Sequence, residues 1–201
     1  MEPLPSKKQE VPLNNQDNQD SPRDAQEILS KDRIIRVITA NREETVAIGT
    51  LLGKLLRAGD VVCLDGDLGA GKTAFTAGIA KGMGIRGVIA SPTFTILIEH
   101  TKQDSNGSGS PLYHFDAYRL SGEDDFYNLG FDEYFSCQGV CVIEWADRIR
   151  AAVPCDAVWV TLRQGTIELS DQRVMTFSFP RKDTRTDLFI QKTTGGEWRR
   201  P

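Results

Sequence analysis

Residues 66–73 read Gly-Asp-Leu-Gly-Ala-Gly-Lys-Thr and match the phosphate-binding loop template G-x-x-x-x-G-K-[ST] at every fixed position. The flanking residues are those that this loop requires. An apolar run at 61–64 predicts a buried parallel strand, and Phe75, Ile79 and Met83 have a helical spacing. Glycines let several backbone N–H groups point at one anion, and the helix N-terminus adds partial positive charge. The motif therefore predicts an α/β fold with a nucleoside triphosphate site.

Individual residues of the loop are expected to bind different parts of the nucleotide and its metal. Lys72 is expected to reach the β- and γ-phosphates as a point charge, and the Thr73 hydroxyl to ligate Mg²⁺. Carboxylates inside the cradle would repel the ligand, so the side chains of Asp65 and Asp67 are interpreted as structural. The predicted ATP-binding segment is Asp67, Leu68, Gly69, Ala70, Gly71, Lys72, Thr73 and Ala74.

Two further acids are expected at the carboxyl edge of the sheet, where ligands of open α/β sheets bind. Glu144 follows the apolar run 140–143, and Asp116 follows the run 112–115. Phosphoryl transfer needs an acid that holds Mg²⁺ or aligns a water, so both acids and Lys72 are candidate catalytic residues. Glu144 is also a candidate metal ligand. The alternative for each acid is a helix cap or an ion pair with an arginine.

Three more residues are candidates for switch or partner roles. Thr93, on a loop stiffened by Pro92, offers a hydroxyl to Mg²⁺ or the γ-phosphate, or caps a helix; with Asp116 it forms a second choice of metal ligands. Arg119 stabilises phosphate charge or pairs with an acid at 123–125. Trp145 packs on a partner, on the site or in the core. No Asn-Lys-x-Asp run is present, which favours ATP over GTP.

The remaining pattern predicts a P-loop NTPase-type, mostly parallel sheet flanked by helices, with a β-hairpin and a C-terminal β-meander. Asn41 and Glu44 form a capping-box arrangement at the start of a helix that Gly59 stops. Other helices are expected at 74–83, 121–129 and 147–152. Strands are expected at 34–38, 61–64, 88–90, 95–99, 112–115, 140–143, 158–162, 167–169 and 174–179. The hairpin joins 95–99 to 112–115 through a long tip at 102–110.

The predicted organisation is one domain at 31–180 between two polar segments. Residues 1–30 lack apolar periodicity and are expected to be a disordered tail, and residues 181–201 a loosely ordered C-terminal tail.

Composition limits the classes of function. A net charge of −4 argues against a surface for polyanions, so any role with nucleic acid is expected to be indirect. No apolar run is long enough for a membrane span, and the first residues lack the apolar stretch of a secretory signal; a soluble, cytoplasmic protein is expected. Two histidines and four cysteines in no zinc pattern predict buried or partly buried reduced thiols and a divalent metal that arrives with the nucleotide.

Four motifs, in this order and at these separations, closely resemble the TsaE family. They are the loop at 66–73, Ser91-Pro92-Thr93-Phe94, His114-Phe115-Asp116-Ala117-Tyr118-Arg119 and Ile143-Glu144-Trp145-Ala146. The resemblance covers about residues 33–165. The tail before residue 31, the insertion at 102–110 and the end after residue 180 depart from a minimal member.

The resemblance implies a Mg²⁺-dependent ATPase that associates with the TsaB and TsaD proteins. It supports their threonylcarbamoyladenosine modification of ANN-decoding tRNAs and meets tRNA through the complex. Carried over by motif, Lys72 and Thr73 hold phosphates and Mg²⁺, while Thr93 and Asp116 belong to switch-like segments. Glu144 takes the Walker B place, in contact with the metal directly or through water.

Two other functions use the same cradle. A small-molecule kinase passes the γ-phosphate to an acceptor hydroxyl, and a nucleotide-dependent binding module has negligible turnover. A kinase needs an acceptor pocket and usually a lid with basic residues, whereas the candidate lid at 101–111 contains only Lys102. Hydrolysis of ATP is therefore the favoured prediction.

Overall fold

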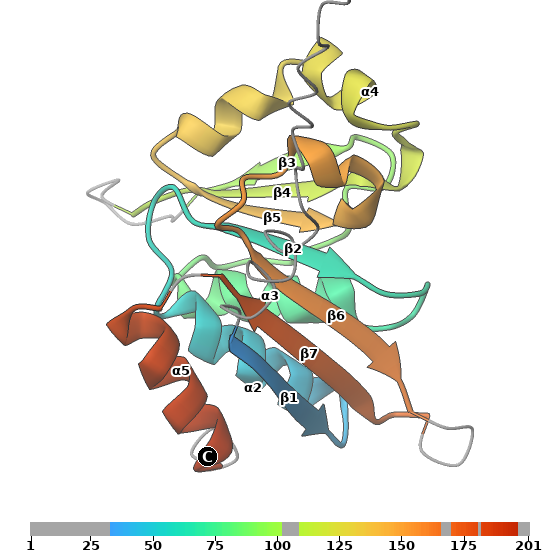
Figure 1. Cartoon of the computed structure of the whole chain (residues 1–201). Helices are drawn as coiled ribbons and strands as arrows, with labels where there is room; N and C mark the ends of the chain where they lie inside the picture. Colours follow the sequence, from blue (N-terminus) through green and yellow to red (C-terminus); the bar gives the residue numbers. More distant parts are fainter. Residues whose placement is uncertain (1–32, 102–108, 166–169, 181, 197–201) are drawn as a thin grey trace, which may run out of the picture. The chain divides into compact units, whose positions relative to one another are not determined.

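The computed structural model describes residues 33–101, 109–165, 170–180 and 182–196. These residues form a seven-stranded sheet in the order β1-β7-β6-β2-β5-β4-β3 (Figure 1). The strands are β1 (Arg33–Thr39), β2 (Val61–Asp65), β3 (Leu97–His100), β4 (Leu112–Asp116), β5 (Val140–Glu144), β6 (Val158–Gln164) and β7 (Arg173–Phe179). The α-helices are α2 (Arg42–Gly53), α3 (Lys72–Gly82), α4 (Glu123–Asn128) and α5 (Thr184–Thr194). Three 3₁₀-helices are η1 (Ala117–Arg119), η2 (Phe131–Ser136) and η3 (Ala146–Ala152).

The centre of the sheet is parallel and its edges are antiparallel. Strands β6, β2, β5 and β4 run in one direction, whereas β7 and β3 run against their neighbours. The predicted mostly parallel sheet, the β3–β4 hairpin and the antiparallel C-terminal pair β6–β7 are confirmed. Strand β1 extends this pair, because it is antiparallel to β7. The predicted tail at 1–30, most of the hairpin tip and the predicted strand at 167–169 lie outside the described residues.

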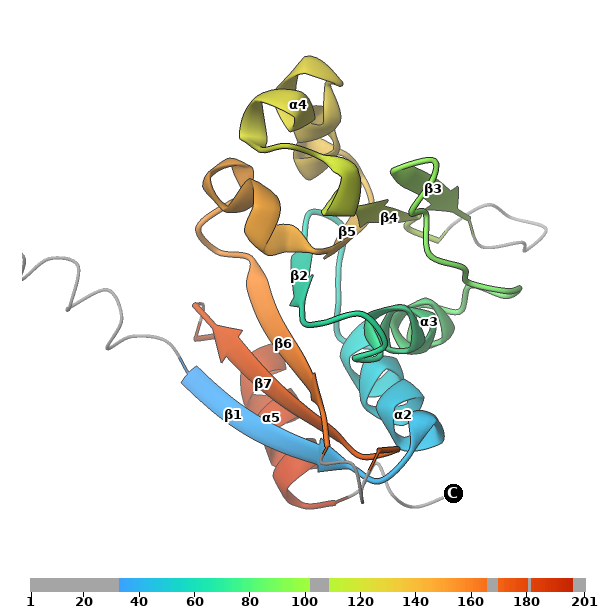
Figure 2. The ribbon, with the colours of Figure 1, turned by 90° about the vertical axis from the view of Figure 1, so that its right-hand side faces the viewer.

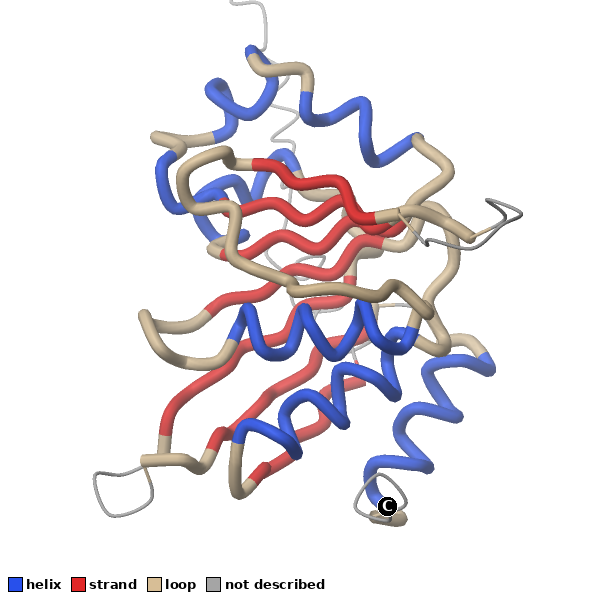
Figure 3. The backbone as a smooth tube through the Cα atoms, turned by 180° about the vertical axis from the view of Figure 1, so that it is seen from behind, coloured by secondary structure: helices blue, strands red, loops and turns tan. Residues whose placement is uncertain are grey.

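Alternate residues of the central strands face two separate hydrophobic cores. Val62 and Leu64 of β2 pack in a core with α2, α3 and α5, whereas Val61 and Cys63 pack with α4 and the 3₁₀-helices on the opposite face. Figure 3 looks onto the first face, with α2, α3 and α5 in front of the strands. Burial on both faces explains why these strands read as continuous apolar runs.

Helices α2 and α3 pack backbone against backbone (Figure 2). Glycines at a spacing of four line the contact: Gly49 and Gly53 in α2, Gly78 and Gly82 in α3. A Cβ atom added at Gly53 would lie 2.2 Å from the carbonyl oxygen of Ile79, a separation that real Cβ atoms do not show. Helix α2 therefore braces the helix that follows the phosphate loop.

The capping box of α2 is confirmed, but its predicted end is wrong. Asn41 Oδ1 accepts from the Glu44 N–H at 2.8 Å, and Glu44 Oε2 accepts from the Ala40 N–H at 2.7 Å. The helix ends at Gly53, and the chain continues through turns to Gly59, whose φ is 85°.

The strand predicted at 88–90 is also wrong. These residues have no regular secondary structure, and Val88 is 91% exposed. A short apolar run without a neighbouring strand to pair with carries no ladder hydrogen bonds, so the apolar pattern alone was misleading.

The prediction of a loosely ordered C-terminal tail is wrong for residues 184–194, which form α5. Asp183 caps this helix by accepting from the Thr186 N–H at 2.8 Å. Phe189 is fully buried, with its ring 5.1 Å from that of Phe177 and 5.5 Å from that of Phe179. The buried ring of Phe189, flanked by the partly buried Leu188 and Ile190, thus anchors a helix whose other residues are polar.

None of the helices formed by the described residues is long and apolar enough to cross a membrane. The four cysteines, all within the described ranges, are unpaired, as predicted for reduced thiols, but the prediction that they are buried or partly buried is wrong for Cys155, which is exposed. Burial raises the pKa of Cys141 to about 12, so this thiol is unreactive in the folded protein.

Candidate active site

The phosphate loop turns sharply between β2 and α3. Gly66, Gly69 and Gly71 have φ values of 142°, 79° and 104°. At Gly66 an added Cβ would also lie 2.2 Å from the carbonyl oxygen of Leu162, so only glycine fits there. Gly71 is the N-cap of α3 and leaves the first helical N–H groups without a side-chain partner. Such N–H groups form an anion-binding site.

Lys72 lies folded back along the loop. Its Nζ donates to the carbonyl oxygens of Gly66 at 2.7 Å and Asp67 at 3.0 Å, and lies 3.8 Å from the centroid of a Trp145 ring. Burial lowers the pKa of Lys72 from its usual value of 10.5, and the nearby Glu144 carboxylate acts in the opposite direction. The ammonium group is therefore held inside the site by contacts that a phosphate oxygen would replace.

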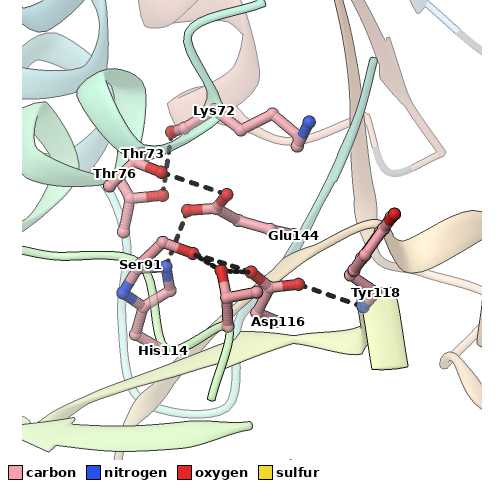
Figure 4. A network of polar contacts seen from close by, with 9 residues as sticks. Lys72, Thr73, Thr76, Ser91, His114, Asp116, Tyr118 and Glu144 are labelled. Carbon is pink, nitrogen blue, oxygen red and sulfur yellow. Dashed lines mark hydrogen bonds and ion pairs between the residues drawn. The ribbon is translucent and has the colours of Figure 1, made fainter. Parts of the chain in front are cut away.

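Glu144 ends β5 beside the first turn of α3, as the sequence predicts. Its Oε2 accepts from the Thr73 hydroxyl at 3.2 Å, and its Oε1 lies 2.9 Å from His114 Nε2 (Figure 4). The side chain of Glu144 is 3% exposed. The acid is thus held next to the hydroxyl that the loop motif assigns to Mg²⁺, and its two partners are neither helix N–H groups nor arginines.

Asp116 ends β4 and joins two loop segments. Its Oδ2 accepts from the Ser91 and Thr93 hydroxyls, both at 2.7 Å, and the two hydroxyl oxygens are 2.8 Å apart. Its Oδ1 accepts from the Tyr118 N–H at 3.0 Å, so Asp116 is also the N-cap of η1. The capping interpretation of Asp116 is therefore confirmed, and its catalytic or metal-binding role stays a prediction.

These groups line one cavity of about 370 Å³. Its walls are formed by loop residues, the two acids with their hydroxyl partners, Trp145, and three residues from the start of α2 and of β7: Arg42, Thr45, Leu68, Gly69, Gly71, Lys72, Thr73, Ala74, Ser91, Thr93, Asp116, Glu144, Trp145 and Arg173. Of the predicted ATP-binding segment, Asp67 and Ala70 belong to the loop but not to this lining. Ala70 is buried, and Asp67 offers its carbonyl oxygen to Lys72.

The sequence did not indicate Arg42, Thr45 or Arg173, because no local motif contains them. They reach the cavity only through the packing of α2 on α3 and the place of β7 in the sheet. Ser91 and His114 are different. Both stand inside the quoted motifs, where a hydroxyl and an imidazole close to the predicted acids are a local signal for this site.

Two candidates for switch or partner roles remain, Arg119 and Trp145. Arg119 makes none of the predicted ion pairs with residues 123–125, all of which are described; its guanidinium lies 4.7 Å from the Phe94 ring centroid. Phe94 is 85% exposed. Trp145 has a φ of 59°, rare for a residue with a side chain, and its ring contacts Lys72 and lies 5.1 Å from the Tyr118 ring.

Asp65 is structural, as predicted. Its Oδ1 accepts from the Asp147 N–H at 2.9 Å, and Arg150 lies 3.9 Å from its other oxygen. Burial, the largest effect, raises the pKa of Asp65. The carboxyl is turned toward η3 and away from the lining of the cavity.

The oxygen groups of the cavity suit a hard divalent cation. Thr73 and Glu144 offer a hydroxyl and a carboxylate in contact, and Asp116 and Thr93 line the same cavity. Mg²⁺ in phosphoryl-transfer sites uses one or two carboxylates, substrate phosphates and several waters, and these residues fit that set.

Comparison with known proteins places the chain in a family. The family model described as "Threonylcarbamoyl adenosine biosynthesis protein TsaE" matches residues 39–174. The tRNA threonylcarbamoyladenosine biosynthesis protein TsaE of Bacillus subtilis is 45% identical over 140 residues, which are 70% of this chain and 82% of that protein. The protein of the same name from Treponema pallidum is 41% identical over 129 residues, 64% of this chain and 91% of that protein.

A solved structure agrees with this relationship. The crystal structure of YdiB from Bacillus subtilis matches with a TM-score of 0.63 at 36% identity, over 83% of this chain and 97% of that chain. The span of the family model contains the phosphate loop, both acids and His114. The chain therefore belongs to the TsaE family.

Proposed function

We propose that this protein is a Mg²⁺-dependent ATPase that supports TsaB and TsaD in the threonylcarbamoyladenosine modification of ANN-decoding tRNAs. The observation that carries the proposal is the contact between Glu144 and Thr73, in one cavity with Lys72 and Asp116. The pathway is supported by the relatives, which are named as tRNA threonylcarbamoyladenosine biosynthesis proteins. Contact with tRNA is proposed to be indirect, through the complex.

Binding of ATP follows from the loop. The N–H groups at the start of α3 receive phosphate oxygens, and Lys72 exchanges its two loop carbonyls for the β- and γ-phosphates. In this exchange, charged phosphate oxygens replace neutral carbonyl oxygens as hydrogen-bond acceptors. Because the ammonium group is already removed from water, its electrostatic attraction to the phosphates is stronger than that of a solvated lysine.

Hydrolysis requires that charge on the phosphates be neutralised and a water be aligned. A bound Mg²⁺ would supply the neutralisation, held by Thr73 and by Glu144 directly or through water. Glu144 is placed for this role because it is buried, negatively charged when ionised, and in contact with the Thr73 hydroxyl. Asp116, beside Glu144 on the neighbouring strand, holds the Ser91 and Thr93 hydroxyls in the lining of the same cavity.

The same contacts couple the site to the surface. Asp116 ties residues 91–94 to the backbone of Tyr118, and these two segments carry the exposed Phe94 and Arg119. Contacts with a γ-phosphate and Mg²⁺ order such segments, and hydrolysis releases them. We infer that this is how the nucleotide state reaches TsaB and TsaD.

The test uses purified protein, TsaB, TsaD and substrate tRNA. Phosphate release from ATP should require Mg²⁺, and Glu144→Gln should lower it on the order of a hundredfold while nucleotide binding is largely kept. Modified tRNA should accumulate over many turnovers only with the parental protein and ATP. Equal accumulation with the parental protein, with Glu144→Gln and without either would refute the pathway role. A phosphorylated small-molecule acceptor in place of free phosphate would indicate a kinase.

Asp116→Asn separates the two acids in the same assay. The amide keeps one oxygen for the Ser91 and Thr93 hydroxyls, so its loss of hydrolysis should be smaller than that of Glu144→Gln. A large loss with Asp116→Asn and none with Glu144→Gln would mean that the roles of the acids are exchanged.

A further inference from the structure

The imidazole of His114 has no part in the steps above, yet it contacts the acid on which they depend. His114 Nε2 lies 2.9 Å from Glu144 Oε1, and the two side chains are 0% and 3% exposed. Strands β4 and β5 are parallel, with His114 beside Val142 and Asp116 beside Glu144. His114 therefore projects from the same face of the sheet as Glu144, from the neighbouring strand and two residues earlier in the register. Figure 4 shows the ring reaching the carboxylate.

The contact has a defined direction. An ionised carboxylate only accepts hydrogen bonds, so Nε2 of His114 carries the proton and donates it. Nδ1 is buried and has no hydrogen-bond partner among the described residues. A buried imidazole that makes one hydrogen bond is less favourable than an apolar side chain of similar size. The favourable contribution of the ring at this position is therefore its contact with Glu144.

The second oxygen of Glu144 shows what the contact achieves. With Oε1 bonded to His114, the plane of the carboxylate is restrained, and Oε2 is directed at the Thr73 hydroxyl 3.2 Å away. We propose that His114 is a positioning residue that holds Glu144 toward Thr73 and so prepares this pair of oxygen groups for a divalent cation. The metal role rests on the proposed function, whereas the orientation of Glu144 does not.

His100 provides a matched control within the same layer. It lies on β3, next to β4, with its ring centroid 6.0 Å from that of His114. Its Nε2 is also buried without a hydrogen-bond partner among the described residues. Loss of this second imidazole changes the same surroundings but removes no contact with Glu144.

The kinetic test compares His114→Phe, His114→Gln and His100→Phe. His114→Phe keeps a ring but loses the donor, and kcat should fall about 10- to 100-fold with KM for ATP little changed. The amide of His114→Gln retains an N–H group and should recover most of the loss, and His100→Phe should match the parent. In a Glu144→Gln background, His114→Phe should cause no further loss. Parental kcat in His114→Phe, or His114→Gln no better than His114→Phe, would overturn the proposal.

A structural test separates this inference from the proposed function. Crystal structures of nucleotide-free parent and His114→Phe should show the Glu144–Thr73 contact only in the parent, and Mg²⁺ should bind the ADP complex of His114→Phe about tenfold more weakly by calorimetry. Retention of both in His114→Phe overturns the positioning role. If the parental protein has no ATPase activity, only the proposed function is refuted. The crystal structures still test whether His114 positions Glu144.

If His114→Phe does not fold, a measurement on the parental protein still tests the proposal. ¹⁵N spectra of the parental protein should show His114 protonated at Nε2, because only that nitrogen faces the carboxylate. A ring protonated at Nδ1 alone would contradict the proposal.

Discussion

Lys72 is a buried ammonium group held between two loop carbonyls and an indole ring. Its lowered pKa, caused first by burial, shows that the positive charge is disfavoured where it lies. Under the proposed function, a bound triphosphate would add negative charge next to this ammonium group, beyond that of Glu144. We therefore expect Lys72 to contribute to nucleotide binding rather than to folding, and the two contributions can be measured separately.

Lys72→Ala should weaken ATP binding about 10- to 100-fold, because a hydrogen bond to a charged group contributes ~1.5–3 kcal/mol. The midpoint of thermal unfolding should not fall, since a desolvated charge is removed. Calorimetry with a non-hydrolysable ATP analogue and a melting curve measure the two effects. Lys81→Ala, at the exposed end of α3, is the control and should match the parent. Unchanged affinity in folded Lys72→Ala protein would exclude the role.

Residue-level prediction from sequence succeeds where the chemistry is local. Thr73 stands at a fixed place in a template, and Glu144 directly follows an apolar run that ends at the carboxyl edge of the sheet. Arg42 and Arg173 could not be found in this way, because they meet the loop only when α2 and β7 are in place. The ion pair predicted for Arg119 is wrong, because the acids that follow it by four to six residues in the sequence lie on a separate helix, α4. Its guanidinium instead lies over the ring of Phe94, which precedes it by 25 residues.

At the scale of elements, helices α2 and α5 are held in the domain by different contacts. Helix α2 contacts α3 through backbone atoms at four glycines, whereas α5 is held by the Asp183 cap, the buried Phe189 ring and an ion pair between Arg185 and Asp60. Most elements could be predicted from apolar periodicity, because the central strands and α3 carry a strong pattern. Helix α5 could not, because a single apolar stripe in a polar segment is close to the pattern of a solvated chain.

Gly53→Ala should lower the free energy of unfolding by about 1–3 kcal/mol, because the new methyl group would overlap the carbonyl oxygen of Ile79. Gly122→Ala is the matched control, since its backbone is extended and no atom lies within 4 Å of the added carbon. Urea denaturation measures both. Equal stability of the two variants would contradict the backbone contact between α2 and α3.

Asp183→Ala should lower stability by about 0.5–2 kcal/mol at neutral pH, as expected for loss of a helix cap. The pKa of Asp183 is lowered: burial acts to raise it, but the hydrogen bond from the Thr186 N–H and the charge of Arg185 outweigh this. An acid with a lowered pKa stabilises the fold above its unfolded value, near 3.8, and loses that contribution as pH falls through the folded value.

The measurement is urea denaturation at several pH values. The stability difference between parent and Asp183→Ala should shrink as the pH falls below 3.8. Asp183→Asn keeps an oxygen for the cap but cannot ionise, so most of its stability should remain, without this pH dependence. If the stability difference between the parent and Asp183→Ala grows as the pH falls, the lowered pKa of Asp183 is contradicted.

At the scale of the whole domain, the cavity lies where both hydrophobic cores meet the carboxyl ends of β2, β4 and β5. By the register of β4 and β5, the acids and His114 lie on the face of the sheet that carries α2 and α3, whereas Trp145 packs against the core of the other face and its ring contacts Tyr118 of η1. Under the proposed function, loss of the γ-phosphate should therefore alter the packing on both faces of the sheet. Partner binding is the global property that should respond.

Affinity for the TsaB–TsaD complex should differ at least about fivefold between the ADP state and the state with Mg²⁺ and a non-hydrolysable ATP analogue. Phe94→Ala should weaken binding, because the ring is 85% exposed on a segment tied to Asp116. Ile34→Ala is the control: Ile34 is 65% exposed on β1, at the opposite edge of the sheet. Equal affinity in both nucleotide states would argue against a switch.

The left-handed backbone of Trp145 lays its indole ring under the Lys72 ammonium group, 3.8 Å from Nζ to the ring centroid. An ammonium group this close perturbs the excited state of indole, so the emission of Trp145 reports the position of Lys72. With Trp159 and Trp198 replaced by phenylalanine, the chain would carry a single tryptophan, in the lining of the cavity. Arrival of a triphosphate would then be visible as a change in emission colour or intensity in stopped-flow mixing, with no label attached to nucleotide or protein.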